Sequence, residues 1–254
     1  MGEIQDTRPI RIYTLGRFSL LRNGEPIRYS SKTKKPIELL KTLLAAGGRE
    51  VGTAQMADIL WPDADGDTAH NTLNVTLHRL RKLLHEPDAI QMADNKLALN
   101  AMHCWVDAWE FERQLNKLES LLKSRHTSPH SIFEGTAELL SLCNGPFLKS
   151  DTCKIIVATR ERLQNRILHV LDSIGQHWEY SGDWGHARNL YLKGLELNPL
   201  LESLYQRLMI CYREMGQRAE AMLVYQRCQE ALSSNLNITP SRYTQDIRRT
   251  LVVD

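Results

Sequence analysis

One segment of the sequence, residues 68–84, carries side chains that could read a nucleic acid. Leucines recur along it at helical spacing and form a narrow apolar stripe. The opposite face carries amide, imidazole, guanidinium and ammonium groups, and no carboxylate occurs between Thr68 and Leu84. Amides and guanidinium groups can bond base edges in pairs of hydrogen bonds, and lysine contacts phosphate. The candidate DNA-contacting residues of this segment are Thr68, Asn71, Asn74, Val75, His78, Arg79, Arg81 and Lys82.

An amphipathic helix with two arginines is more often simply a solvated helix, so the elements around it decide its interpretation. Two helix patterns precede it, at residues 34–46 and 53–61. Thr33 can cap the first of them, and Gly47-Gly48 can end it. Three short helices, of which the third is the basic one, are the order of a helix-turn-helix protein, whose recognition helix enters the major groove.

A hairpin is expected directly after the basic helix, at residues 90–100. Apolar residues flank Asp94-Asn95 there, which is a typical two-residue turn. This hairpin would be the wing of a winged helix, with Asn95 and Lys96 at its tip and in reach of DNA backbone or minor groove.

A small antiparallel sheet is expected before the helices. Residues 10–15 and 17–21 read as short, partly alternating strands, and Asn23-Gly24 is a strong hairpin signal before a return strand at residues 26–28. The fold class is therefore mainly α, with an N-terminal α+β winged helix.

The rest of the chain reads as an all-α array. Helix patterns lie at residues 107–124, 129–144 and 153–181. The segments that begin at Gly182 and Gly216 then align at an offset of 34 residues, which is the tetratricopeptide period. A last helix at residues 241–252 would cap the stack. The predicted domains are residues 8–104 and 105–254.

Composition excludes several classes of protein. The 32 basic and 30 acidic residues of this 254-residue chain leave a net charge of +2, which argues against binding driven by bulk charge. No apolar run is long enough for a bilayer, and the first residues lack a secretory signal. Five scattered cysteines are typical of reduced thiols, so we expect a cytoplasmic protein. We expect no association with a membrane.

The sequence also resembles a known family. The runs LGRFSLLRNG, LLKTLLAAGGREV and ILWPDADGDTAHNTLNVTLHRLRKLL are similar to the effector domain of OmpR/PhoB-type regulators. Leu60-Trp61-Pro62 and Leu80-Arg81-Lys82 match more closely the Streptomyces antibiotic regulatory protein (SARP) type. In that type a bacterial transcriptional activator domain follows the winged helix, and the resemblance covers the chain from about Arg11 to Val252.

The resemblance implies partners and a second site. It places the recognition helix at residues 68–84, and it implies double-stranded promoter DNA with repeated sites, bound in tandem or by a homodimer. The acidic loop before this helix would contact RNA polymerase through Pro62, Asp63, Asp65 and Asp67. Two departures stand out: helix 68–84 has fewer arginines than many relatives, and Asn95-Lys96-Leu97 replaces a Gly-Tyr pair in the wing.

We therefore expect a sequence-specific transcriptional regulator that activates its targets. The alternative is a non-enzymatic protein-interaction scaffold, which could be the C-terminal output part of a larger regulator, with a winged helix that binds protein. No phosphate loop, dinucleotide motif or nucleophile elbow occurs, so neither an enzyme nor a cofactor is expected. No metal site is expected either, because His103-Cys104 has no partners at zinc spacing.

Overall fold

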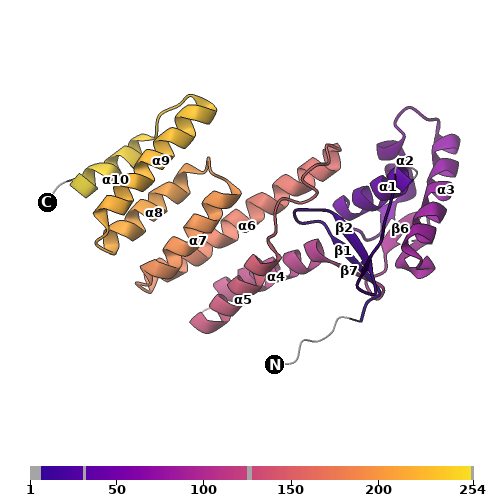
Figure 1. Ribbon diagram of the computed structural model, residues 1–254, viewed down its shortest axis with the longest axis horizontal. Coiled ribbons are helices and arrows are strands. Elements are labelled where there is room, and N and C mark those ends of the chain that lie inside the picture. Colours follow the sequence, from indigo (N-terminus) through magenta and orange to yellow (C-terminus); the bar gives the residue numbers. More distant parts are fainter. Residues whose placement is uncertain (1–6, 31–32, 125–127, 253–254) are drawn as a thin grey trace. The chain divides into compact units, whose positions relative to one another are not determined.

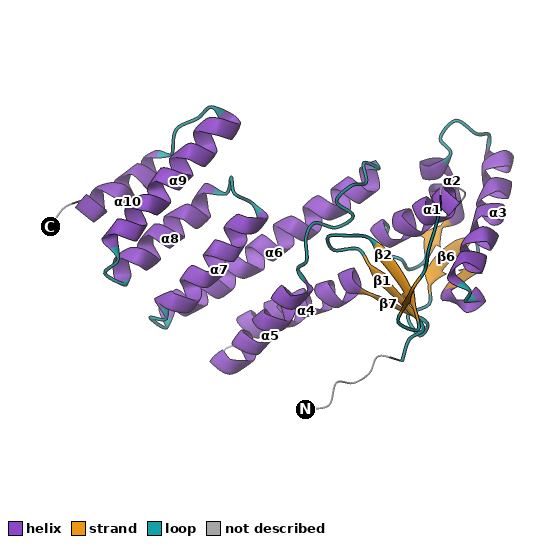
Figure 2. Ribbon diagram, viewed as in Figure 1, coloured by secondary structure: helices purple, strands orange, loops and turns teal. Residues whose placement is uncertain are grey.

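The computed structural model describes residues 7–30, 33–124 and 128–252 (Figure 1). The chain divides into two compact units. The first comprises the residues up to Gln114 together with Ala137–Leu163, and the second comprises Leu115–Thr136 and the residues from Gln164 onward. All strands of the described residues fall in the first unit, and the second is helical (Figure 2). The predicted fold class is confirmed.

The first unit opens with a four-stranded sheet of order β3-β2-β1-β7. Strands β1 (Ile10–Tyr13), β2 (Ser19–Arg22) and β3 (Glu25–Pro26) are antiparallel, as predicted. Asn23 and Gly24 form the β2–β3 turn with positive φ angles of 49° and 86°. The sheet is not purely antiparallel, however. A fourth strand, β7 (Cys104–Val106), lies parallel to β1 and precedes the helical part of the chain.

Three helices follow: α1 (Lys34–Ala45), α2 (Thr53–Leu60) and α3 (Gly66–Leu84). They pack on one another through leucines, and all leucines of α1 and α3 except Leu83 are buried. Gly47 and Gly48 end α1 with positive φ angles of 99° and 72°, as expected. Thr33 precedes α1 but does not cap it, because its hydroxyl group bonds the backbone of Ser30 instead.

The predicted wing is present as β5 (Ile90–Ala93) and β6 (Lys96–Leu99). Asp94 and Asn95 form its turn with φ angles of 48° and 56°. A short strand, β4 (Val51–Gly52), pairs with β6 and makes a three-stranded sheet of order β4-β6-β5. The turn η2 (Pro87–Ala89) connects α3 to the wing.

A buried carboxylate joins the first sheet to the helix that follows it. Asp107 is 3% exposed and begins α4 (Asp107–Lys123). Its carboxylate accepts hydrogen bonds from the Thr14 backbone and hydroxyl, from Leu15 N and from Ala108 N, at 2.6–2.9 Å. Burial raises the pKa of Asp107, and these hydrogen bonds oppose that rise. The carboxylate therefore satisfies donors at the end of β1 that would otherwise be buried without partners.

The first unit also contains the connection between α5 (Pro129–Leu142) and α6 (Lys154–Tyr180). Gly16 packs so closely against it that a Cβ atom there would lie 2.6 Å from the Asn144 oxygen. Gly16 N donates to Pro146 O (3.1 Å), and Arg160 Nε donates to Phe147 O (2.7 Å). The compact unit therefore extends beyond residue 104.

Four helices complete the second unit. They are α7 (Trp184–Leu197), α8 (Glu202–Glu214), α9 (Arg218–Leu236) and α10 (Arg242–Val252). Each of the first three packs on the next, and α10 packs on α8 and α9 (Figure 1). Within the described residues, no helix is both long and apolar enough to cross a membrane.

The 34-residue repeat recurs in the backbone. Gly182 and Gly216 have positive φ angles of 75° and 73° and lie in open space, as residues that end a helix do. Ala187 and Ala221 are both fully buried, and small residues there let neighbouring helices approach closely. Equivalent turn hydrogen bonds also repeat, namely Asp183 N to Trp178 O (2.9 Å) and Gln217 N to Tyr212 O (2.8 Å).

Candidate nucleic-acid interface

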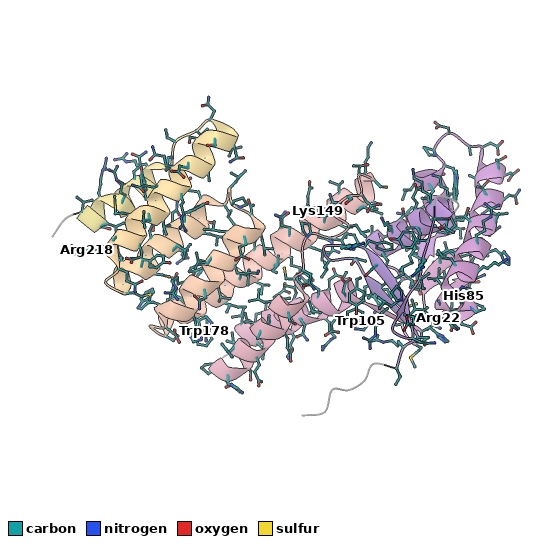
Figure 3. All side chains as sticks on the ribbon, in the orientation of Figure 1. Arg22, His85, Trp105, Lys149, Trp178 and Arg218 are labelled. Atoms are coloured by element: carbon teal, nitrogen blue, oxygen red, sulfur yellow. The ribbon has the colours of Figure 1, made fainter. Side chains whose placement is uncertain are left out.

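Helix α3 begins at a side-chain cap. Asp65 accepts a hydrogen bond from Thr68 N at 2.8 Å, and the Thr68 backbone and side chain together lower the pKa of the Asp65 carboxyl. A carboxylate is favoured at this position because it satisfies an otherwise unpaired backbone donor and faces the positive end of the helix dipole. The helix ends at Leu84, and the following residue, His85 (labelled in Figure 3), adopts a left-handed conformation with φ 51°.

The apolar side of α3 is fixed in the core. The leucines of the predicted stripe are at most 2% exposed, and they are Leu73, Leu77, Leu80 and Leu84. The helix contacts both α1 and α2. This packing determines which residues of α3 face solvent.

Six of the predicted DNA-contacting residues on α3 are exposed: Thr68, Asn71, Val75, His78, Arg79 and Lys82. The side chains of Asn71, His78, Arg79 and Lys82 make no hydrogen bond or ion pair with any other described residue. Val75 is a branched apolar side chain that is 51% exposed among them. This face therefore offers donors, one apolar contact and two permanent cations to a ligand outside the chain.

Asn74 differs from its neighbours because it is partly buried. Its side-chain Oδ1 is inaccessible to solvent and has no hydrogen-bond partner among the described residues. Buried polar atoms are normally paired, and an exception calls for an explanation.

Arg81 has a partner inside the protein. Its Nε and Nη2 donate to the carbonyl oxygen of Ile90 at 3.0 and 2.7 Å. Ile90 begins strand β5, so this arginine joins α3 to the base of the wing. The structure thus gives Arg81 a positioning role that its spacing on the helix does not indicate.

The wing tip is exposed, as predicted for Asn95 and Lys96. Asn95 O accepts a hydrogen bond from Thr53 N at 2.8 Å, which ties the turn to the start of α2. Lys96 Nζ lies 3.4 Å from Glu50 Oε2, and both side chains are mostly exposed. The sequence did not reveal that this acidic group lies beside the wing.

The acidic loop before α3 is exposed throughout residues 62–67. Pro62, Asp63 and Asp67 are accessible, whereas Asp65 is occupied as the cap of α3. Lys35 lies near the start of the loop, where its Nζ is 5.8 Å from the centroid of the Trp61 ring.

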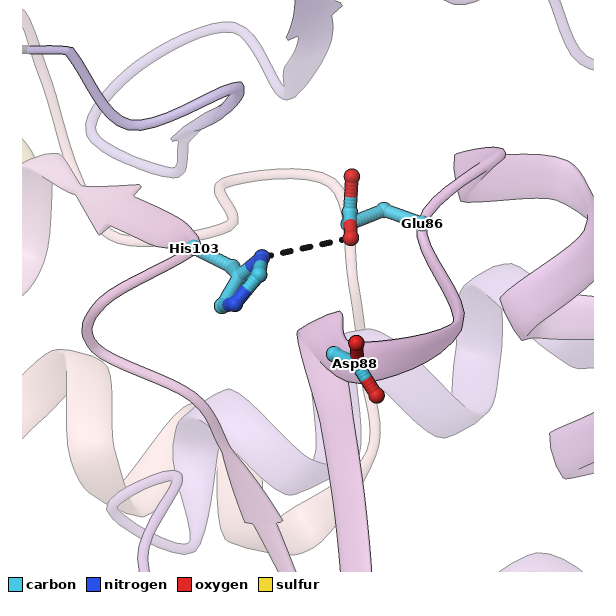
Figure 4. Close-up of side chains that lie close together, drawn as sticks. All are labelled: Glu86, Asp88 and His103. Carbon is cyan, nitrogen blue, oxygen red and sulfur yellow. Dashed lines mark ion pairs between the residues drawn. The ribbon is translucent and has the colours of Figure 1, made fainter.

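One group of side chains near the wing is not apparent from the sequence. His103, from the turn before β7, lies beside Glu86 and Asp88, which flank the start of η2 (Figure 4). Residues this far apart in the chain carry no spacing signal that could have linked them.

The class of the protein follows from three features: an exposed polar face of α3 without carboxylates after Asp67, a wing, and a helical stack. It is a winged-helix transcription regulator with a helical partner domain. Comparison with known families agrees. Residues 28–95 match the model described as transcriptional regulatory protein, C terminal. Residues 106–252 match the bacterial transcriptional activator domain. The second match covers more than half of the chain, and the chain belongs to this family.

A solved structure of Mycobacterium tuberculosis EmbR in complex with a low-affinity phosphopeptide has a similar fold. The TM-score is 0.68 at 17% identity, and the match covers 96% of this chain. It spans 65% of the EmbR chain, so the present sequence corresponds to a part of that structure. No curated protein matches the sequence. The resemblance to SARP-type regulators is thus confirmed at the level of both domains.

Proposed function

We propose that this transcriptional regulator reads its promoter by placing α3 in the major groove of DNA, and that it acts as an activator. The observation that carries the proposal is the face of α3 described above, which is exposed and carries no carboxylate after Asp67 in the first turn. On it the side chains of Asn71, His78, Arg79 and Lys82 have no partner within the described residues. Asn71 has the chemistry to bond adenine through both amide atoms, whereas Asn74, whose Oδ1 is buried, can offer a base only its amide nitrogen. Arg79 has the chemistry to bond guanine, and Lys82 to contact phosphate. Val75 offers an apolar contact to a thymine methyl group.

The other candidate residues have supporting roles in this proposal. Thr68 and His78 contact the backbone or base edges at either side of the face, and Asn95 and Lys96 contact the adjacent backbone or minor groove. Arg81 acts on DNA through the wing that it holds. Functionally we divide the chain into a DNA-binding domain, residues 8–104, and an activator domain, residues 105–254.

Two further contacts complete the proposed mechanism. The exposed loop with Pro62, Asp63 and Asp67 offers RNA polymerase an acidic surface beside the DNA. The helical domain pairs two copies on repeated sites, as a homodimer or in tandem, and a stack of paired helices is a common scaffold for such contacts. A regulator that acts in this way on bacterial promoters works in the cytoplasm and needs no catalytic residue.

The test begins with selection of bound sequences from a random DNA pool by the full chain. Arg79→Ala should then weaken binding to the selected site by about 5- to 150-fold, because a bidentate base contact is worth roughly 1–3 kcal/mol. Arg227→Ala is the matched control, since it removes the same charge from an exposed position on α9. Equal affinities of the two variants would contradict the proposal.

Salt dependence separates this function from the scaffold alternative. A DNA-reading protein should lose affinity steeply as salt rises, with a slope set by its phosphate contacts. Weak binding without sequence preference in the selection would instead favour a winged helix that binds protein.

A further inference from the structure

Glu86, Asp88 and His103 form a compact group of three metal-ligating side chains away from the proposed DNA-reading face. One ligand atom from each lies within 4.8 Å of the others. His103 Nδ1 and Glu86 Oε1 are 3.2 Å apart. Figure 4 shows the Glu86 carboxylate facing the His103 ring, with Asp88 on the turn just below them. We propose that these residues bind one divalent transition-metal ion, with zinc as the best-fitting probe.

The backbone that carries the three side chains is held by hydrogen bonds. Ala89 N donates to Glu86 O at 3.2 Å, which closes the turn that presents Glu86 and Asp88. His103 N donates to Asn100 O at 3.0 Å, and His103 O accepts from Ile10 N at 3.0 Å. The two segments are joined by Asn100 N, which donates to Ala89 O at 2.9 Å. The ligands are therefore presented by fixed turns, which lowers the entropy cost of assembling a site.

The spacing suits a small transition-metal ion. Zinc binds histidine nitrogen and carboxylate oxygen at about 2.0–2.2 Å, so two ligand atoms of a tetrahedral site lie about 3.3–3.5 Å apart. The separation of 3.2 Å between His103 and Glu86 is close to one such edge. Asp88 is exposed and can rotate to supply the third oxygen, which leaves the fourth position to water.

The chemistry of the donors narrows the class of ion. An imidazole with two carboxylates favours zinc and its neighbours over magnesium, which prefers all-oxygen octahedral surroundings with several waters. Cys104 follows His103 but is fully buried, and its Sγ lies 3.6 Å from Ala89 O. It is engaged with the interior, so the proposed site has nitrogen and oxygen ligands only.

The site lies where three elements of the first unit meet. Glu86 follows the end of α3, Asp88 precedes the wing strand β5, and His103 precedes β7 of the first sheet. An ion there would fasten the end of the recognition helix and the base of the wing to that sheet. If α3 and the wing bind DNA as proposed, the ion would raise DNA affinity by ordering the wing. The metal site itself does not depend on that function.

The experiment is a zinc titration of the full chain by calorimetry and thermal unfolding, without DNA. The wild-type chain should bind one equivalent of Zn²⁺ and unfold at a higher temperature in its presence, because an ion that binds only the folded state stabilises it. Magnesium should give no shift. Co²⁺ should produce the visible absorption of a low-coordinate site.

Loss of a residue that only supports a metal ligand typically lowers metal affinity by roughly 10- to 100-fold. Asp88→Asn and His103→Gln each remove a ligand, so each should weaken zinc binding by more than that. Asp88 is exposed, so its variant is expected to fold, and circular dichroism of the metal-free chains checks this. His130→Gln is the matched control. His130 Nε2 pairs with Glu134 at 3.1 Å on α5, but that pair belongs to no three-residue ligand group among the described residues.

Three results would overturn the proposal. The wild-type chain could show no zinc binding, which would make Glu86–His103 an ordinary ion pair. Zinc binding could survive in both Asp88→Asn and His103→Gln, which would locate the ion elsewhere. His130→Gln could lose binding as strongly as they do. These measurements contain no DNA. They therefore test the metal site even if α3 does not bind DNA.

Discussion

The guanidinium group of Arg81 donates two hydrogen bonds to one backbone oxygen, that of Ile90, at 3.0 and 2.7 Å. Arg81 lies in the last turn of α3, and Ile90 begins the wing. Ile90 is 1% exposed, so few other donors can reach this oxygen. The angle between helix and wing is therefore held by a charged side chain.

Arg81→Ala should lower the free energy of unfolding by about 1.5–3 kcal/mol, the usual range for hydrogen bonds from a charged donor to a buried acceptor. Urea denaturation followed by circular dichroism measures this change. Arg79→Ala should stay within about 0.5 kcal/mol of wild type, because an exposed, unpaired arginine contributes little to stability. If both variants are equally stable, the Arg81–Ile90 contact does not hold the wing.

Asn74 should show a conflict between stability and function. Its buried Oδ1 has no partner, and replacing an unsatisfied polar group with an apolar one of similar size removes a desolvation cost. Asn74→Leu is expected to raise the free energy of unfolding by about 1 kcal/mol and to weaken binding to the selected DNA site.

Asn71→Leu is the control for this pair of effects. Asn71 is exposed on the same face, so leucine there should bring no comparable gain in stability while it also weakens DNA binding. A destabilised Asn74→Leu variant would show that the Asn74 amide is satisfied in solution.

Much of the fold follows from sequence patterns because each pattern has a direct steric cause. Positive φ angles at Asn23 and Gly24 make a tight turn, and the glycines of the repeat end their helices in the same way. The strands β4 and β7 were not predicted, because segments of two or three residues are too short to show a period. The boundary of the first compact unit could not be predicted from the sequence either, because it depends on contacts between distant residues such as Gly16 and Asn144.

The candidate site was predictable only in part, for a related reason. The exposed face of α3 follows from helical spacing and from the missing carboxylates, both of which are local properties. The partner of Arg81 is a backbone oxygen in another element, and Glu50 reaches Lys96 from a different turn. Residue types and spacing carry no information about such contacts.

Because Asp65 caps α3, the protein should lose stability at acid pH, where this carboxylate becomes protonated. Hydrogen bonds from Thr68 lower the pKa of Asp65 below its ordinary value of 3.8. When the pKa of a carboxyl is lower in the folded state, its ionised form stabilises the fold. This stabilisation is complete above the pKa of the unfolded state, and it is lost as the pH falls through the pKa of the folded state. The Asp65 carboxyl should therefore titrate below pH 3.8 in a carbon-detected nuclear magnetic resonance experiment.

Asp65→Asn keeps an oxygen that can accept from Thr68 N but removes the titrating group. Its unfolding free energy should fall less than that of wild type between about pH 6 and pH 3. Asp63→Asn, in the same exposed loop, is the control and should follow the wild-type pH dependence. Identical acid profiles for all three chains would mean that ionisation of the Asp65 carboxyl does not contribute to stability.

The pairing of Lys96 with Glu50 predicts opposite effects of two neutral substitutions at the wing. If Lys96 contacts phosphate, Lys96→Gln should weaken binding to all DNA sequences alike and reduce the salt slope by about 1. Glu50→Gln should strengthen binding, because it removes both the competitor for the lysine and a negative charge beside the DNA. The gain should be at most about fivefold, since exposed ion pairs are worth roughly 0.2–1 kcal/mol.

Fluorescence anisotropy at several salt concentrations measures both effects. Because the two side chains are exposed, neither change should alter the fold, and a wing that does not approach DNA would leave both affinities at the wild-type value.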